Sequence, residues 1–427
     1  MEIKRIADLP VVKSAPENGH VLIEDGGYAK RIPVDDLTAA KMDYSAFGIP
    51  VLELIGDISA MSKDNKVALS YVYGDKTGML SCKWQGSSSL AYPKKNYTVE
   101  FDKAFEAKTG WGTQKKYCLK ANWVDASNMR NILGAKMWGQ LVKERSGADE
   151  RLKALPNGGA IDGFPIWVTI NGDPMGLYTM NIPKEAWLFG MTGENGGEGY
   201  VCADRCTLAS AVTGTAAEDG VYDVKIEYAA SDESALLASL NNMISVVNAV
   251  NASGDMAALE AVVDVNSVID YYCLMVYLSH KDGISRNYIL ATYDGAKWFM
   301  SAYDMDGTFG NNWDGKQYFW PNVWPMFDNG DGSGLTLGMN NLLDVVRKYY
   351  GPQIKARYQA VRDWSWGEIN MNTIVYNMAL QFPNALVDED FRLWPGRPGT
   401  LTNNAHQILD WLRIRGASLD WNVQNIV

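Results

Sequence analysis

The stretch Asp282–Gly310 has the sequence DGISRNYILATYDGAKWFMSAYDMDGTFG, and it contains the pattern that decides the fold. Two apolar and aromatic runs, Tyr288–Tyr293 and Trp298–Tyr303, predict strands, and Asp294-Gly295 between them predicts a tight turn. Acidic and amide residues stand before the first strand and after the second. We therefore expect a hairpin that carries polar residues at its open end.

Four residues at that open end are candidates for a metal site and for acid–base chemistry. Asp282 and Asn287 are five apart in the loop before the first strand, and Asp304 and Asp306 follow the second strand. Protein kinases place an Asp and an Asn with this spacing in the catalytic loop, and a later Asp holds Mg²⁺ against ATP phosphates. Hard oxygen ligands on adjacent loops suit Mg²⁺, and a third acidic residue can orient an attacking hydroxyl. A purely structural interpretation, with turns and strand caps that are acidic, stays open.

The run Ala302–Phe309, AYDMDGTF, permits a second interpretation. It has the form of the first motif of haloacid dehalogenases, in which the first Asp accepts a phosphoryl group and the second is an acid/base. That family carries the motif on the first strand of a parallel, doubly wound sheet, whereas here it comes at residue 304. A phosphatase of that type is therefore the less favoured interpretation.

Lysines are concentrated between residues 83 and 120. This segment has eight lysines and three acidic residues, in a chain whose net charge is −11. The small-residue loop Gly86–Ser89 precedes Lys94 and Lys95. Backbone N–H groups of such a loop, together with ammonium groups, could bind phosphates, which makes Ser88 a further candidate. A solvated basic strand face is the other interpretation.

The whole chain has a globular composition with an acidic balance. Its 427 residues are 47% hydrophobic and 21% charged, which excludes a disordered polymer and allows two or three domains. The acidic net charge disfavours nucleic-acid binding. Five scattered cysteines predict buried thiols and no zinc site. Because no apolar run is long enough to span a bilayer and no secretory signal is visible, we expect a protein made in a cytoplasm without membrane insertion.

Strands are predicted first along the chain, and helices later. The predicted strands before residue 120 are Val51–Ile58, Val67–Tyr73, Leu80–Trp84 and Tyr97–Phe101. Ser127 is a candidate N-cap for a helix that runs to Lys143, and Asn171-Gly172 marks another hairpin. Residues 232–280 and 338–427 are predicted to be helical, and Asp264–Leu278 is apolar nearly all round, as a core helix is.

The run Lys120–Asn131, KANWVDASNMRN, resembles the signature of the CotH (spore-coat protein H) kinase family, in which a Lys-x-Asn-Trp/Tyr-x-Asp-x-Ser-x-x-Arg-Asn run opens a helix. The resemblance spans residues 50–365 and includes Gly86-Ser87-Ser88, Lys94-Lys95-Asn96-Tyr97, Asn171-Gly172, Gly176-Leu177-Tyr178, Asn287-Tyr288 and Asp304–Gly310. It implies an α+β, atypical protein-kinase-like bilobed fold, with a β-rich N-lobe and a helical C-lobe. We assign this domain to residues 46–365, and a helical extension packed on the C-lobe to residues 366–427.

The resemblance also implies a chemistry, which is ATP- and Mg²⁺-dependent phosphorylation of protein Ser or Thr. By position, Asp282 would be the catalytic-loop Asp. The predicted metal ligands are Asn287, Asp304 and Asp306. The predicted nucleotide contacts are Lys94, Lys95, Ser88 and Arg130.

Two departures from the family pattern bear on activity. The Glu that usually stands four residues past Tyr178 is Ile182, and a Tyr-Lys pair of many members is replaced within Val201–Ala203. The loss of an acid and a lysine would remove an ion pair of the kind that kinases use to place ATP. A relative that binds without catalysis is therefore an alternative. Arg130 has a structural interpretation as well, in which it ties a helix start to an acidic loop.

Residues 1–45 resemble the short virion-attachment leaders of phage tail, neck or head-fibre proteins, through Ile6–Pro10, Val21–Gly27 and Lys30–Pro33. A turn at Asp25–Gly27 predicts a hairpin here, followed by a helix from Asp35. The resemblance implies an anchor that docks on other virion proteins while the rest of the chain is displayed.

The leading hypothesis is therefore a bacteriophage virion accessory protein that displays a CotH-like domain. We expect it to be located in the virion, assembled in the host cytoplasm and homo-oligomeric. Aromatic residues around Trp313–Trp324 are candidates for contact with the host surface, although buried anchors are the commoner use of such residues. The alternative is an active CotH-type protein Ser/Thr kinase. ATP and Mg²⁺ are the cofactors expected of the active protein, and none is expected otherwise.

Overall fold

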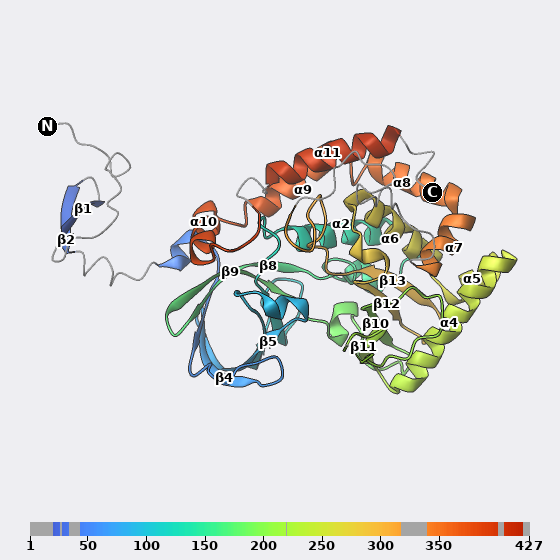
Figure 1. Cartoon of the computed structure of the whole chain (residues 1–427), viewed down its shortest axis with the longest axis horizontal. Coiled ribbons are helices and arrows are strands. Elements are labelled where there is room, and N and C mark those ends of the chain that lie inside the picture. The colour runs from blue at the N-terminus through green and yellow to red at the C-terminus, as the bar shows by residue number, and fades with distance from the viewer. Residues whose placement is uncertain are drawn as a thin grey trace. The chain divides into compact units, whose positions relative to one another are not determined.

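The computed structural model of the chain describes residues 20–25, 28–33, 43–218, 220–316, 340–399 and 405–421. Most of its strands lie before residue 204 and most of its helices after residue 232 (Figure 1). The predicted α+β class, with a β-rich N-terminal region and a helical C-terminal region, is confirmed.

Contacts within the chain divide it into two units, residues 1–49 and 50–427. In the first unit, β1 (His20–Asp25) and β2 (Tyr28–Pro33) pair antiparallel. The hairpin predicted around Asp25–Gly27 is thus confirmed. The predicted segment Ile6–Pro10 and the helix predicted from Asp35 lie outside the described residues.

Seven strands of the second unit form a closed barrel in the order β3-β4-β5-β6-β7-β9-β8. Six of the seven pairings are antiparallel, and the parallel pairing of β3 with β8 closes the barrel. The strands are β3 (Val51–Ile55), β4 (Val67–Tyr73), β5 (Lys76–Gln85), β6 (Asn96–Phe105), β7 (Gln114–Lys120), β8 (Gly163–Ile170) and β9 (Asp173–Asn181).

Alternating side chains fill the barrel. In β4, Leu69 and Tyr71 are buried while Ser70 between them is exposed. The Tyr71 ring packs edge-on against Phe101 of β6, with 4.8 Å between the ring centroids. All four strands predicted before residue 120 are present, and so is the hairpin at Asn171-Gly172. Strand β7 was not predicted.

Helix α2 (Arg130–Glu144) follows β7 and begins three residues later than its predicted N-cap, Ser127. The reason is Asn128, whose φ of 57° lies in the left-handed region and cannot continue a right-handed helix. Ser127 Oγ still accepts a hydrogen bond from Met129 N at 3.2 Å, and Asp125 Oδ2 accepts one from Arg130 N at 2.8 Å. A short helix, α3 (Glu150–Ala154), leads on towards β8.

A second sheet has the order β11-β10-β12-β13 and is antiparallel throughout. Its strands are β10 (Gly199–Ala203), β11 (Val224–Ala229), β12 (Tyr288–Thr292) and β13 (Trp298–Ala302). The predicted hairpin turned at Asp294-Gly295 is β12–β13. The haloacid-dehalogenase interpretation is wrong in its structural context, because Asp304 follows an edge strand of an antiparallel sheet and not a strand of a parallel one.

Helices pack around this sheet and around the core helix α6 (Figure 1). They are α4 (Glu233–Ser253), α5 (Met256–Val262), α6 (Val265–Leu278), α7 (Asn341–Tyr349), α8 (Gly351–Asp363), α9 (Glu368–Ala379), α10 (Asn384–Leu393) and α11 (Ala405–Trp421). As predicted, α6 is buried over nearly its whole length, between α2, α7, α8, α11 and β13. By length and composition alone α4 could cross a bilayer, a test that core helices of soluble proteins also pass, and here α4 packs on α5, α7 and β11.

Helix α10 lies against β9 of the barrel (Figure 1), so the C-terminal helices do not pack on helices alone. The buried carboxylate of Asp390 in α10 accepts hydrogen bonds from Leu177 N at 2.9 Å and from Lys94 Nζ at 2.7 Å. Arg397 Nη1 pairs with the other oxygen of the same carboxylate. The approach is close because the strand has Gly176 here, with a φ of 103°.

We predict that Gly176→Ala destabilises the fold by about 2–4 kcal/mol, because a Cβ would meet Asp390 Oδ1 and would occupy an unfavourable backbone region. Gly74→Ala is the matched control, since Gly74 has a φ of 60° but no atom within 4 Å of the added Cβ. Its expected cost is about 1 kcal/mol. Urea unfolding of both variants measures the difference, and equal costs would contradict the close contact with Asp390.

Candidate active site

The hairpin β12–β13 brings two predicted metal ligands to the same end of the sheet. Tyr288 pairs with Ala302, so Asn287, just before β12, and Asp304, two residues after β13, lie at the same end of the hairpin. Both residues have positive φ angles, 50° for Asn287 and 53° for Asp304. Asn287 N donates to Ala203 O at 3.0 Å, which ties this end of the hairpin to β10. Unfavourable backbone conformations of this kind cluster at functional sites.

Asp282 lies in a short 3₁₀ helix, η5 (Asp282–Ile284), directly after α6. Its neighbour His280 is buried, and a Cβ on Gly283 would lie 2.5 Å from the imidazole Cδ2, so only glycine fits there. Burial lowers the pKa of His280, and the carboxylates of Asp282 and Asp304 oppose that shift. His280 is therefore a buried member of this group that sequence reasoning missed.

A pocket lined in part by Asp304 and Asp306 adjoins the hairpin end. Its described lining residues are Ser89, Tyr92, Lys94, Asn96, Lys120, Asn122, Trp123, Val124, Asn131, Asp304 and Asp306. The rings of Tyr92 and Trp123 stack with 5.7 Å between their centroids. The pocket thus combines two carboxylates, two lysines and an aromatic pair.

The carboxylates of this site are crowded together. Burial raises the pKa of Asp306 well above its ordinary value, and the nearby carboxylates of Asp304, Asp125 and Asp282 raise it too, while Lys120 lowers it. A bound cation would relieve this repulsion between like charges. The donor set is therefore compatible with the Mg²⁺ that the family resemblance implies.

Within the described parts of the chain, no group of three or more His, Cys, Asp or Glu side chains forms a metal site. Mg²⁺ sites in nucleotide enzymes commonly use one or two carboxylates and complete the octahedron with water and substrate phosphates. Asp304 and Asp306, which face the pocket, could supply those carboxylates, and Asn287 could supply an amide oxygen.

The predicted nucleotide contacts are placed in three different ways. Lys94 lines the pocket, but its buried ammonium donates to Asp390 Oδ1, Leu177 O and Ala121 O. Lys95 is half-buried and donates to the backbone oxygens of Leu90 and Tyr92. Ser88 is exposed in the 3₁₀ helix η3 (Ser88–Ala91), and it is the next residue, Ser89, that lines the pocket.

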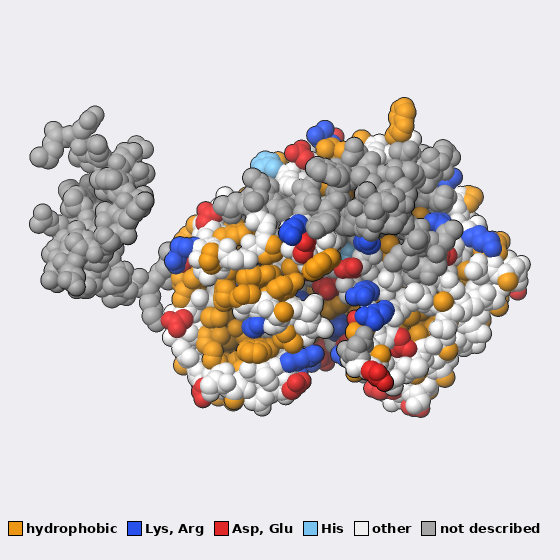
Figure 2. Space-filling model, in the orientation of Figure 1, with side chains coloured by type: hydrophobic (Ala, Val, Ile, Leu, Met, Phe, Trp, Pro, Cys, Tyr) orange, Lys and Arg blue, Asp and Glu red, His pale blue; other side chains and the backbone are white. Residues whose placement is uncertain are grey.

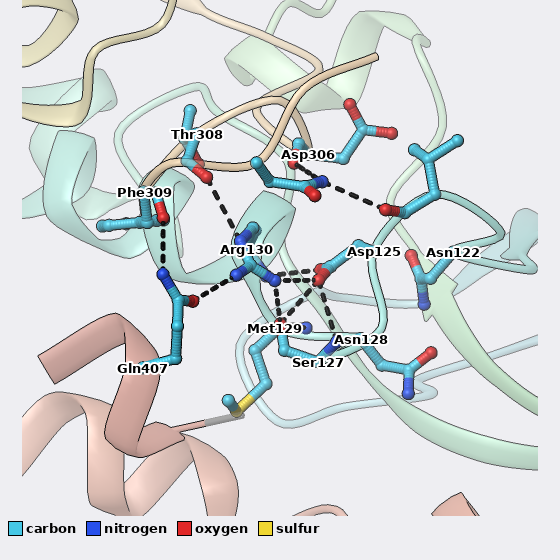
Figure 3. Close-up of polar contacts among 12 residues, drawn as sticks. Asn122, Asp125, Ser127, Asn128, Met129, Arg130, Asp306, Thr308, Phe309 and Gln407 are labelled. Carbon is cyan, nitrogen blue, oxygen red and sulfur yellow. Dashed lines mark hydrogen bonds and ion pairs between the residues drawn. The ribbon is translucent and has the colours of Figure 1, made fainter. Parts of the chain in front are cut away.

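Arg130, the fourth predicted nucleotide contact, lies at the centre of a buried network (Figure 3). Its Nη1 donates to Asp125 Oδ1 at 2.6 Å and to Ser127 Oγ at 3.0 Å. Its Nε donates to Thr308 O at 3.2 Å, and its Nη2 donates to Gln407 Oε1 of α11. These contacts match the structural interpretation, in which Arg130 ties the helix start to an acidic loop. A contact with nucleotide stays a prediction.

The same network positions the loop that carries Asp306 (Figure 3). Asn131 Oδ1 accepts a hydrogen bond from Met305 N at 3.1 Å, and Asn311 Nδ2 donates to Asp306 O at 2.9 Å and to Val124 O at 3.0 Å. The two acidic residues after β13 are thus held against the start of α2 and the loop before it.

The sequence of this chain matches a known protein family. The profile described as CotH kinase protein matches residues 82–419, which is most of the chain. The chain belongs to the CotH kinase protein family. No curated protein matches it. The predicted family membership is confirmed, while the predicted boundary after residue 365 falls inside the matched region. The resemblance of residues 1–45 to phage leaders stays a prediction.

The two departures from the CotH pattern are both buried. Ile182 follows β9 and Ala203 ends β10, and each is about 2% exposed. An apolar side chain therefore stands where the resemblance implies an acid, and another ends the run where it implies a Tyr-Lys pair. Aromatic residues around Trp313–Trp324 lie partly outside the described residues, and Trp313 itself is exposed.

We predict that Arg130→Met destabilises the protein by about 3–5 kcal/mol, because it leaves the buried Asp125 carboxylate without its cation. Lys66→Met is the control, since the Lys66–Glu100 pair is exposed on both sides and is worth less than about 1 kcal/mol. Chemical denaturation gives both values. A cost below 1 kcal/mol for Arg130→Met would show that the Arg130–Asp125 pair does not hold the site together.

Proposed function

We propose that this protein is an ATP- and Mg²⁺-dependent phosphotransferase that acts on protein Ser or Thr, with the barrel and the sheet–helix region as the two lobes of a kinase-like fold. The observation that carries the proposal is the group of carboxylates at the end of β12–β13, which adjoins a pocket that also presents lysines. Bound Mg²⁺ would neutralise phosphate charge and orient the terminal phosphoryl group.

Each residue of the group has a role in this proposal. Asp304 and Asp306 hold the metal from the pocket side, and Asn287 completes the donor set from the other strand of the hairpin. Asp282, half-buried in η5, accepts the proton of the attacking hydroxyl. Lys120 balances charge close to Asp306 and is the pocket lysine available to a phosphate, because the Lys94 ammonium already has three acceptors.

We predict that Asp304→Ala lowers phosphoryl transfer from labelled ATP by at least about 100-fold in the presence of Mg²⁺, because a metal ligand is lost. Asp410→Asn is the control, since Asp410 is an exposed residue of α11. Labelling of added protein substrate and of the chain itself is measured for all three proteins. Equal labelling by Asp304→Ala and the unchanged protein would refute the proposal, and no labelling by any of them would favour a binding role.

We also propose that residues 1–45 attach the protein to a bacteriophage particle, where it displays the CotH domain as a homo-oligomer. Supporting features are the leader-like sequence and the division of the chain into two units, with the hairpin β1–β2 in the first. Binding of the displayed domain to the host surface would be a further consequence of this attachment.

Mass spectrometry of purified particles tests the attachment. We expect the protein in particles formed with the full chain, and we expect its loss when residues 1–45 are deleted. The absence of the full chain from particles would contradict the virion role without bearing on phosphoryl transfer.

A further inference from the structure

Lys184 lies between the barrel and the four-stranded sheet, in the segment after β9. Its Nζ forms an ion pair with Glu227 Oε1 of β11 at 2.5 Å. The same ammonium lies 4.8 Å from the centre of the Tyr303 ring, and Tyr303 is the residue immediately before Asp304. The cation is therefore fixed from two sides, next to the chain that carries the predicted metal ligands.

Lys184 shares its carboxylate partner with a second lysine. The nearly buried carboxylate of Glu227 pairs with two lysines. Its Oε1 contacts Lys184, and its Oε2 lies 3.4 Å from Lys225 Nζ. The three groups together carry one net positive charge. Lys225 is the outer partner, with its side chain 54% exposed, whereas the Lys184 side chain is 22% exposed. An ammonium has three donors, and the pair with Glu227 occupies one of them.

Two buried side chains, Tyr303 and Cys202, are each influenced by the charges of both Lys184 and Asp304. Burial raises the pKa of the Tyr303 phenol, Lys184 opposes this effect and Asp304 adds to it. Burial also raises the pKa of Cys202, with the same opposite contributions from Lys184 and Asp304. Figure 2 shows acidic and basic side chains gathered between the barrel and the strands of this sheet.

We infer that Lys184 contacts the terminal phosphates of the nucleotide, with Glu227 as the carboxylate that holds the lysine in place. The inference rests on the proposed function, because it assigns a residue to the nucleotide of that same site. A lysine held by one carboxylate and still carrying free donors is suited to an anion at the edge of a metal site. The pair joins β11 to the segment that leaves the barrel after β9.

The test measures the affinity of the full chain for two probes, ATP with Mg²⁺ and AMP, by titration calorimetry. We expect Lys184→Met to weaken ATP binding by roughly 10- to 100-fold, the value of one charge-assisted contact, and to leave AMP binding unchanged. Lys184→Arg should keep ATP affinity within about threefold, because the charge is retained. Lys225→Met is the matched control, since it removes the other lysine of the same carboxylate, and we expect no change in ATP binding.

The outcomes separate this inference from the proposed function. Binding of ATP by the unchanged protein and by Lys184→Met with equal affinity overturns the role of Lys184 and leaves the proposed function standing. Equal weakening of ATP and AMP, or equal effects of Lys184→Met and Lys225→Met, also overturns it, because neither pattern fits a contact with terminal phosphates. No binding of ATP by the unchanged protein overturns both proposals. Thermal unfolding shows whether each variant is folded, and Lys184→Gln replaces Lys184→Met if that variant is not.

Discussion

The buried ion pair between Arg130 and Asp125 is the constraint on which the rest of the site depends. Neither side chain is more than 1% exposed, so both charged groups have lost nearly all contact with water. Hydrogen bonds within the protein must compensate for this desolvation cost. Asp125 accepts from Ser127 and from the backbone and side chain of Arg130, and the guanidinium also reaches Thr308 and Gln407. Three segments far apart in the sequence meet at this point. The loop with Asp306, the pocket wall and α11 are consequently parts of one rigid assembly.

The local sequence pattern predicted the strands and helices that are determined by residues close together in the chain. The strands of the hairpins β8–β9 and β12–β13 have clear apolar runs with turn residues between them, and α6 is apolar nearly all round. Strand β7 was missed because QKKYCLK has lysines at two of its first three positions, and it is the pairing with β6 and β9 that makes it a strand. The short strands β10 and β11 are likewise strands because they pair with each other, and their ladder has an irregularity between Tyr200 and Val201.

The candidate site was predictable where its residues share one hairpin and unpredictable where distant segments meet. The predicted hairpin placed Asn287 and Asp304 at the same end of the sheet, because the antiparallel ladder pairs Tyr288 with Ala302. No local pattern shows that Lys94 would be buried against Asp390, which is 296 residues away, or that Lys184 would pair with Glu227. Lys94 was predicted to contact nucleotide, and Lys184 has no distinguishing pattern in the sequence. Their partners, and therefore their pKa values and accessibility, are set only by the tertiary fold.

The distance between Lys94 and Asp390 along the chain also concerns how the protein is made. A ribosome adds about 5–20 residues per second, so some 15–60 s pass between the synthesis of the lysine and that of its carboxylate, which is 296 residues later. From the synthesis of Asn181 onward, all seven strands of the barrel have been made, but the anion that neutralises the buried ammonium is still missing. The lysine must stay hydrated, or lose its proton, until α10 has emerged. The barrel therefore reaches its final packing only late in translation, although it is encoded in the first half of the chain.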